Sequence, residues 1–200
     1  MRNVTITTNY DVYRFSELSE SAKERFREWF LEHIRYADDF TDMCEENLSE
    51  LFPNSDLKVQ YSLGYCQGDG LNIYGDLNLE DIFNKIKDDF TDKEQKFFRH
   101  IFSEFSYRYK MERNNHYCYC ICDRYDYSED ITWDMEYANY RNIRYDLLEK
   151  FDQLARDYMS ELCGIFEDSG YKYFYEVSDE ELEDFAECND YEFTDDGNIF

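Results

Sequence analysis

LKVQYSLGYCQGDGLNIYGD, residues 57–76, determines the class of fold that we expect for this chain. Apolar and polar residues alternate over residues 57–65, and they alternate again over 71–74. A period of two is typical of β-strands that bury one face. Between the two runs lies Asp69-Gly70, a pair that favours a tight turn because glycine accepts a positive φ. The stretch therefore predicts an antiparallel β-hairpin.

The turn of this hairpin is a poor match to known ligand-binding loops. A phosphate loop is followed by a helix whose N–H groups face the anion, whereas here a strand follows and Asp69 would repel phosphate. A calcium loop needs more oxygen ligands than Gln67 and Asp69 supply. We therefore interpret the segment as a turn, with Asp69 and Gln67 forming an exposed tip available for contact with a partner.

Helical and extended patterns follow one another irregularly along the rest of the chain. Apolar residues spaced by three or four indicate amphipathic helices. Ser19 is a predicted N-cap, Asn78 and Asp81 are expected at the start of another helix, and Thr91–Glu94 and Ser178–Glu181 fit the capping box. A second hairpin is expected at about residues 107–123, and 131–137 is a candidate further strand. The expected helices cover about residues 19–34, 40–51, 78–87, 91–105, 140–168 and 178–188, the longest being 140–168.

Because strands and helices do not alternate strictly, a doubly wound parallel sheet is excluded. We predict an α+β fold in which antiparallel hairpins, at about 57–76 and 107–123, pack against amphipathic helices. The length of 200 residues favours a single domain, 1–200, with an acidic helix and hairpin element at about 176–200. Asp196-Gly197 is expected to form a tight turn in this element. Gly170 is expected to end the longest helix, since glycine is common just after a helix C-terminus.

The charge of the chain restricts its partners. Asp and Glu number 47 and Lys and Arg number 21, so the formal net charge is −26. Such a chain repels nucleic acid and anionic membranes and is attracted to basic surfaces. We therefore expect no direct binding to nucleic acid or membrane, and we expect the partner to be the basic surface of a nucleic-acid-binding protein. A merely solvated acidic surface is the alternative.

Acidic residues are most concentrated after residue 176, where the chain has no Lys, Arg or His up to residue 200. Duplex DNA presents one charge per about 1.7 Å of its axis, and carboxylates on a helix and an adjacent turn can approach that density. This array could therefore imitate DNA phosphates. The predicted partner-binding residues here are Asp179, Glu180, Glu181, Glu183, Asp184, Glu187, Asp190, Glu192, Asp195 and Asp196.

No pattern in the chain indicates catalysis. There is no nucleophile elbow, phosphate loop or zinc-protease helix, and the only histidines are His33, His100 and His116. The segment HYCYCICD, residues 116–123, places one histidine and three cysteines on one face of a strand. Same-face neighbours on a strand lie about 6.6 Å apart, too far for two thiolates on one zinc ion. We expect no enzyme, cofactor or metal; a metal protein or enzyme using Cys118–Cys122 is an alternative.

The cysteines also indicate the cellular compartment in which the protein is expected. Their number is seven, so they cannot all pair with one another, and the first residues lack the apolar core of a signal peptide. Nor does any stretch approach the ~20 apolar residues of a membrane span. We therefore expect reduced thiols and a cytoplasmic protein.

Three segments resemble a known group of proteins: FSELSESAKERF at 15–26, YSLGYCQGDG at 61–70 and NDYEFTDDGNIF at 189–200. They are similar to a family of small acidic proteins from bacterial viruses and prophages, largely uncharacterised and sometimes labelled antitoxin-like. The resemblance implies a viral or mobile-element origin, the host cytoplasm as the site of action, and no established catalytic residues. HYCYCICD departs from the family pattern.

The charge and the resemblance together predict a phage-encoded, non-enzymatic inhibitor. It would imitate nucleic acid and occupy the groove of a host defence nuclease of the restriction or CRISPR type. The alternative is a toxin-neutralising or adaptor protein that binds by shape and aromatic contacts, the aromatic share being 20%. The salt dependence of binding distinguishes the two hypotheses, because only the electrostatic complex weakens steeply with ionic strength.

Overall fold

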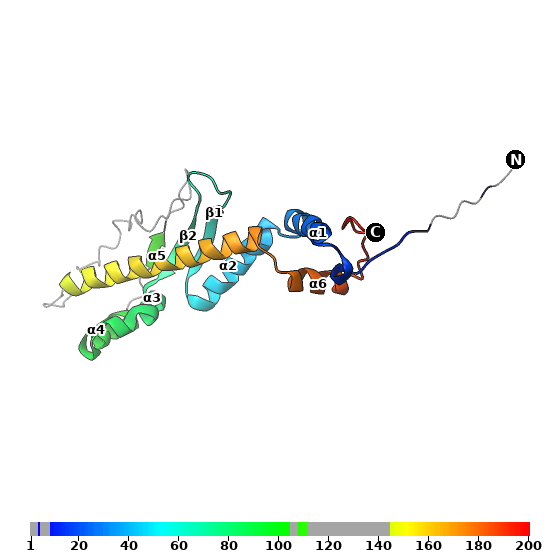
Figure 1. Cartoon of the computed structure of the whole chain (residues 1–200). Helices are drawn as coiled ribbons and strands as arrows, with labels where there is room; N and C mark the ends of the chain where they lie inside the picture. Colours follow the sequence, from blue (N-terminus) through cyan, green and yellow to red (C-terminus); the bar gives the residue numbers. More distant parts are fainter. Residues whose placement is uncertain (1–3, 5–8, 105–107, 112–144) are drawn as a thin grey trace. The chain divides into compact units, whose positions relative to one another are not determined.

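The computed structural model describes residues 4, 9–104, 108–111 and 145–200 (Figure 1). The chain forms two compact units. The terminal unit consists of Met1–Ala37 and Tyr171–Phe200, and the central unit consists of Asp38–Gly170.

The central unit contains an antiparallel sheet in the order β1-β2-β3. Strands β1 (Asp56–Ser62) and β2 (Gly70–Asn78) form the predicted hairpin, with Val59 opposite Ile73. Strand β3 (Arg108–Met111) pairs with the second half of β2. The α+β class is confirmed. The rest of the second expected hairpin, 112–123, and the candidate strand 131–137 lie outside the described residues.

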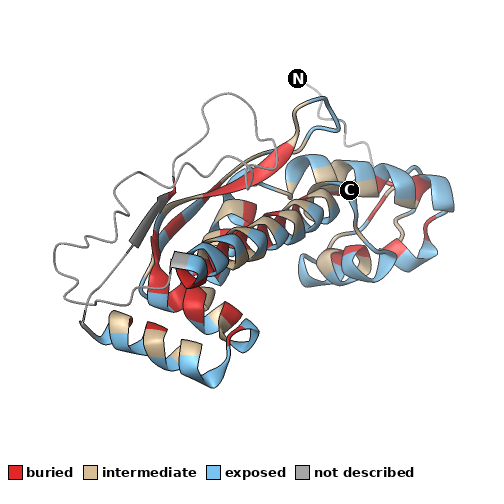
Figure 2. Cartoon of the chain, turned by 90° about the vertical axis from the view of Figure 1, so that its left-hand side faces the viewer, coloured by how far each residue is buried: buried red, intermediate tan, exposed pale blue. Residues whose placement is uncertain are grey.

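Helices α2 (Ala37–Leu51) and α5 (Tyr145–Tyr175) lie beside the hairpin (Figures 1 and 2). The buried side chains of β1 and β2 include Leu57, Val59, Leu71 and Ile73, so the alternating apolar residues form the core of this unit. The aromatic rings of α2 and β1 meet directly, because Phe40 and Tyr61 lie edge to face with centroids 5.2 Å apart.

A cluster of phenylalanines fills the space between α5 and two shorter helices, α3 (Leu79–Ile86) and α4 (Asp92–Glu104), which the 3₁₀ turn η2 (Lys87–Asp89) joins. Contacting rings have centroids 5.0 to 6.4 Å apart. Part of the high aromatic content of the chain is therefore explained by packing in the core. The members of the cluster are Phe83, Phe90, Phe98, Phe102 and Phe151.

A buried carboxylate fixes the start of α3. Asp81, 4% exposed, accepts hydrogen bonds from the backbone N–H of Asn54 at 2.8 Å and from Ser55 Oγ at 2.8 Å. Asn78 caps the helix as predicted, its side-chain oxygen accepting from the N–H of Glu80 at 2.9 Å. The turn that follows α2 is thereby tied to the end of β2.

The terminal unit packs α1 (Glu20–His33) against α6 (Asp179–Cys188) and the 3₁₀ turn η1 (Phe15–Glu17). Ser19 caps α1 as predicted, accepting from the N–H of Ala22 at 3.3 Å. The core of the unit consists of Phe15, Leu18, Ala22, Phe26, Phe30, Leu182, Ala186 and Phe193.

The C-terminal segment closes this core. Phe193 exchanges two backbone hydrogen bonds with Tyr13, both of 2.9 Å. The centroid of its ring lies 4.7 Å from the ring centroid of Phe26. The predicted turn at Asp196-Gly197 is present, and Gly197 has a φ of +87°. A Cβ at Gly197 would lie 2.2 Å from the carbonyl oxygen of Ala22, so only glycine allows this turn to contact α1 so closely.

The prediction that Gly170 ends the longest helix is wrong. Helix α5 continues to Tyr175, and the expected residues 140–144 lie outside the described ranges. Gly170 lies within the helix, where a Cβ would be 2.3 Å from Leu63 Cδ1 and 2.9 Å from Phe40 Cζ. The glycine therefore permits close packing of α5 on the hairpin loop and α2; it does not terminate the helix.

Alanine substitutions at the two glycines of α5 should have opposite effects. Gly170→Ala should lower the free energy of unfolding by about 1–3 kcal/mol, because Leu63 and the buried ring of Phe40 must move. Gly164→Ala should raise it by roughly 0.5–1 kcal/mol, because nothing lies within 4 Å of its Cβ position and alanine favours the helix. Urea titrations of both variants measure the difference; equal effects would contradict this packing.

Candidate functional site

Helix α6 carries most of the predicted partner-binding acids. The side chain of Ser178 caps the helix by accepting from the N–H of Glu181 at 3.1 Å, as predicted. Asp179, Glu180 and Glu181 occupy the first turn, where the positive end of the helix dipole favours carboxylates. The buried residues of α6 are Leu182 and Ala186, so the acids of this helix lie outside the core.

The end of α6 is a Schellman motif, which fixes the directions of the residues that follow. The N–H of Tyr191 donates to the carbonyl of Ala186 at 2.9 Å, and that of Asp190 donates to the carbonyl of Glu187 at 3.1 Å. Asp190 has a φ of +54°, a left-handed conformation that glycine usually adopts at this position. The motif places Asp190, Tyr191 and Glu192 next to the last turn of α6.

Two of the predicted partner-binding acids, Asp179 and Asp196, form ion pairs with cations of α1. The carboxylate of Asp179 pairs with Arg27, and with Lys23 at 3.7 Å. Asp196 pairs with Arg25 at 2.9 Å, and its backbone carbonyl accepts from the same guanidinium at 2.7 Å. The hydrogen bond from the hydroxyl of Thr194 is the main reason that the pKa of Asp196 lies below its usual value, with Arg25 a smaller cause.

Arg35 engages a third acid, Glu181. Its guanidinium carbon lies 5.1 Å from the ring centroid of Phe30 and 4.7 Å from that of Tyr173. Two aromatic rings and one carboxylate therefore hold this cation within the terminal unit. The carboxylate of Glu181 was expected to form a capping box with Ser178; the structure pairs it with Arg35.

The remaining seven predicted acids of the terminal unit lack such a partner. Within the described ranges, no Lys, Arg or His nitrogen lies within 4.0 Å of their carboxylates. All are exposed except Glu183, which is half-buried. We call them the uncompensated carboxylates: Glu180, Glu183, Asp184, Glu187, Asp190, Glu192 and Asp195.

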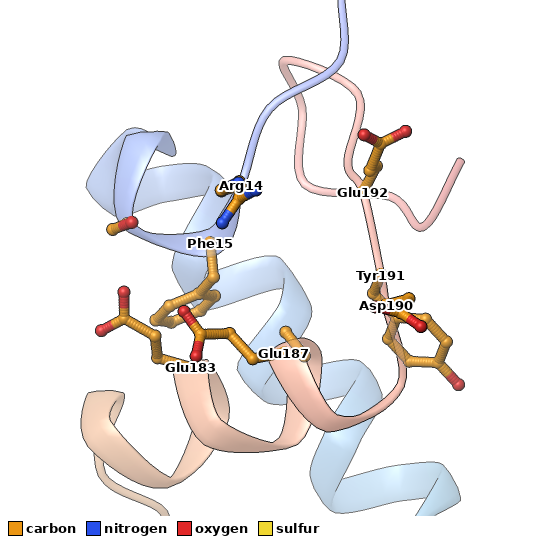
Figure 3. A pocket seen from close by; sticks show the side chains of 9 residues that line it. Arg14, Phe15, Glu183, Glu187, Asp190, Tyr191 and Glu192 are labelled. Atoms are coloured by element: carbon orange, nitrogen blue, oxygen red, sulfur yellow. The ribbon is translucent and has the colours of Figure 1, made fainter.

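Four of these seven line one pocket, with a volume of about 400 Å³. Figure 3 shows Glu183 and Glu187 extending from α6 beside the ring of Phe15, with Arg14 above that ring in this view. The complete lining is Arg14, Phe15, Ser16, Glu183, Ala186, Glu187, Asp190, Tyr191 and Glu192.

The composition of this pocket suits an organic cation. Its four carboxylates face one guanidinium, so its lining carries a net negative charge. Phe15 is 3% exposed and supplies an aromatic wall, to which Tyr191 adds a second ring. Sequence reasoning did not find Arg14 or Phe15, because they lie more than 160 positions from α6 and nothing in their own neighbourhood indicates a site.

The two partner-contact residues predicted at the hairpin tip, Asp69 and Gln67, belong to the central unit, and their surroundings differ. Asp69 accepts from the N–H of Gly64 at 2.7 Å, the N–H of Cys66 at 2.9 Å and Ser62 Oγ at 3.1 Å. Its carboxylate therefore holds the loop together. Gln67 is exposed.

The thiols and histidines form no metal-binding group within the described ranges. His33 lies on α1, where its Nδ1 is 2.9 Å from the carbonyl oxygen of Trp29. Burial raises the pKa of Cys44 to about 12, so this thiol is protonated at neutral pH. His116 and the Cys118–Cys122 segment lie outside the described residues.

Comparisons with known proteins identify no relative. No family model, curated protein or solved structure matches the chain. No helix in the described part of the chain combines the length and the hydrophobicity needed to cross a bilayer.

Two neighbouring acids in the first turn of α6 should respond differently to neutralisation. Asp179→Asn removes the partner of Lys23 and Arg27, so it should lower the free energy of unfolding by about 0.2–1 kcal/mol at low salt. Glu180→Gln is the matched control: it removes a carboxylate from the same helix turn that has no such partner, so its loss should be smaller and should come from the helix dipole alone. Thermal unfolding at about 0.05 M and 1 M NaCl measures both; a loss that persists at high salt would contradict the pairing.

Removing the charge of Asp69 should activate the thiol of Cys66. The hydrogen bond that Cys66 Sγ donates to Asp69 at 3.1 Å is the main cause that raises the pKa of this thiol. In Asp69→Asn the pKa should therefore fall, and alkylation by iodoacetamide at pH 8 should accelerate roughly two- to fivefold. Mass spectrometry of the labelled peptides gives the rate for each thiol.

Cys188 is the internal control, because it is exposed and lies in the other unit. Its rate should stay unchanged in the variant. If the rate of Cys66 also stays unchanged, Asp69 does not control this thiol.

Proposed function

We propose that this protein is a non-enzymatic inhibitor that binds the basic nucleic-acid-binding surface of another protein. The observation that carries the proposal is the set of seven uncompensated carboxylates on α6 and the segment after it. They belong to one small unit in which Lys23, Arg25, Arg27 and Arg35 are already paired with other acids. A basic partner would supply the counter-charges that the terminal unit lacks.

The mechanism is competition by charge. Carboxylates directed outward from a folded helix take the places that phosphates of DNA or RNA would take in a basic groove. The net charge of −26 accelerates the encounter with such a groove and repels nucleic acid itself. No chemical step is required of the inhibitor.

The choice of target follows from the resemblance to proteins of bacterial viruses. A virus that enters a bacterium meets nucleases of restriction or CRISPR type, whose grooves are basic because they bind nucleic acid. We propose that the protein acts in the host cytoplasm on such a defence nuclease.

A toxin-neutralising or adaptor protein is the second candidate. The exposed ring of Tyr65, 70% accessible at the tip of the β1–β2 loop, favours it, because an aromatic side chain on an ordered loop is a common anchor for a partner. Binding through this tip would depend on shape and apolar contact and would resist salt.

Capture from bacterial lysate distinguishes the two candidates. The tagged protein should retain a nucleic-acid-binding enzyme at about 50 mM NaCl and release it at about 500 mM NaCl. The triple variant E180Q/D184N/E187Q should lose this capture. The control D42N/E46Q/E50Q changes the net charge equally, at exposed positions of α2 in the central unit, and should retain it.

A partner that survives the high-salt wash would contradict charge competition and favour the adaptor. Equal loss of capture in both triple variants would show that only the total charge matters, and would remove α6 from the proposal.

A further inference from the structure

The terminal unit already contains one example of how it binds a guanidinium group. Arg35 lies over the rings of Phe30 and Tyr173, at 5.1 and 4.7 Å, and its charge is met by Glu181. The components are two aromatic rings and a carboxylate, an arrangement that suits a planar cation.

The pocket between η1 and the end of α6 also combines aromatic rings with carboxylates, and Arg14 is the one cation in its lining. Lys23 Nζ lies 5.3 Å from the centroid of the Phe15 ring, so one face of this ring already has a cation of the protein over it. The buried ring of Phe15 and the half-buried ring of Tyr191 are its aromatic walls. Glu183 and Glu187 lie beside Phe15, as Figure 3 shows. The Schellman motif adds the carboxylate of Asp190 from the left-handed position after the helix.

The size and charge of the pocket limit which chemical group can bind in it. Its volume of about 400 Å³ is enough for one long side chain and lies near the lower end of ligand pockets, which span roughly 300–1,000 Å³. Four carboxylates and one guanidinium leave the lining with three negative charges. Arg14 shares the lining with the acids, so an incoming cation is favoured on the side formed by α6.

We infer that this pocket receives an arginine side chain from the basic surface of the partner, an inference that rests on the proposed function. The guanidinium donates hydrogen bonds to Glu183 and Glu187. Arginine is favoured over lysine, because its planar fork can bind a carboxylate through two parallel hydrogen bonds. This contact is the anchor, and the other uncompensated carboxylates surround it.

Titration calorimetry with short synthetic peptides tests this assignment. The probe is a Gly/Ser peptide that carries two arginines, compared with the same peptide carrying lysine or the uncharged isostere citrulline. At about 50 mM NaCl the arginine peptide should bind, the lysine peptide should bind at least ~5-fold more weakly, and the citrulline peptide should not bind.

A matched pair of variants locates the binding. E183Q/E187Q removes two carboxylates of the pocket, and E180Q/D184N removes two uncompensated carboxylates of the same helix that do not line it. The pocket variant should raise the Kd of the arginine peptide at least ~5-fold more than the control variant does. In the wild type, bound arginine peptide should also protect Glu183 and Glu187 from carbodiimide coupling, a result that does not depend on any variant.

Two outcomes overturn the inference and are distinguishable. If both variants weaken binding equally and no carboxylate is selectively protected, attraction to the acidic unit is diffuse; the pocket assignment fails and the proposed function stands. If neither charged peptide binds the wild-type protein at low salt, the pocket assignment and the proposed function fail together.

Discussion

Ion pairs from Arg35 and from the cations of α1 determine which C-terminal carboxylates of the terminal unit keep no internal counter-charge. Asp179, Glu181 and Asp196 are engaged from within the unit. These pairs hold α6 and the last residues of the chain against α1, close to the core. The acids that no cation engages lie on α6 and on the segment after it. Folding therefore divides the acids into a structural group and an uncompensated group.

A chain with a net charge of −26 needs a strong apolar core to offset its own repulsion. Aromatic rings supply much of that core in both units. Phe83, Phe98 and Phe151 are almost fully buried in the central unit, as are Phe26 and Phe193 in the terminal unit. The phenylalanines are thus largely structural, whereas the most exposed aromatic residues include the tyrosines Tyr10, Tyr36 and Tyr65. The aromatic content therefore does not by itself indicate a binding surface.

Local signals in the sequence predicted the local structure. The alternation of apolar and polar residues predicted which side chains of the hairpin are buried. Ser19, Asn78 and Ser178 could be predicted as caps because a helix cap depends only on residues within one turn. Gly170 was misread because the same residue type serves to end a helix or to let another element approach it. Only the contacts with Phe40 and Leu63, far away in the sequence, decide between these roles.

The candidate site was only partly predictable for the same reason. Its acids are evident from the composition of residues 176–200, but their division by internal ion pairs depends on α1. Phe15 and Arg14 complete the pocket from the other end of the chain. Asp69 was expected to be a contact residue because it lies in an exposed turn, yet its carboxylate is occupied by the backbone of its own loop.

Competition between this protein and nucleic acid for one enzyme is the decisive measurement. The nuclease retained from lysate is loaded with a fluorescent duplex that it binds, and the protein is added at increasing concentration and at two salt concentrations. Charge mimicry predicts complete displacement of the duplex, with an inhibition constant that rises steeply with salt. A ternary complex in which the enzyme keeps its nucleic acid with unchanged affinity would contradict it.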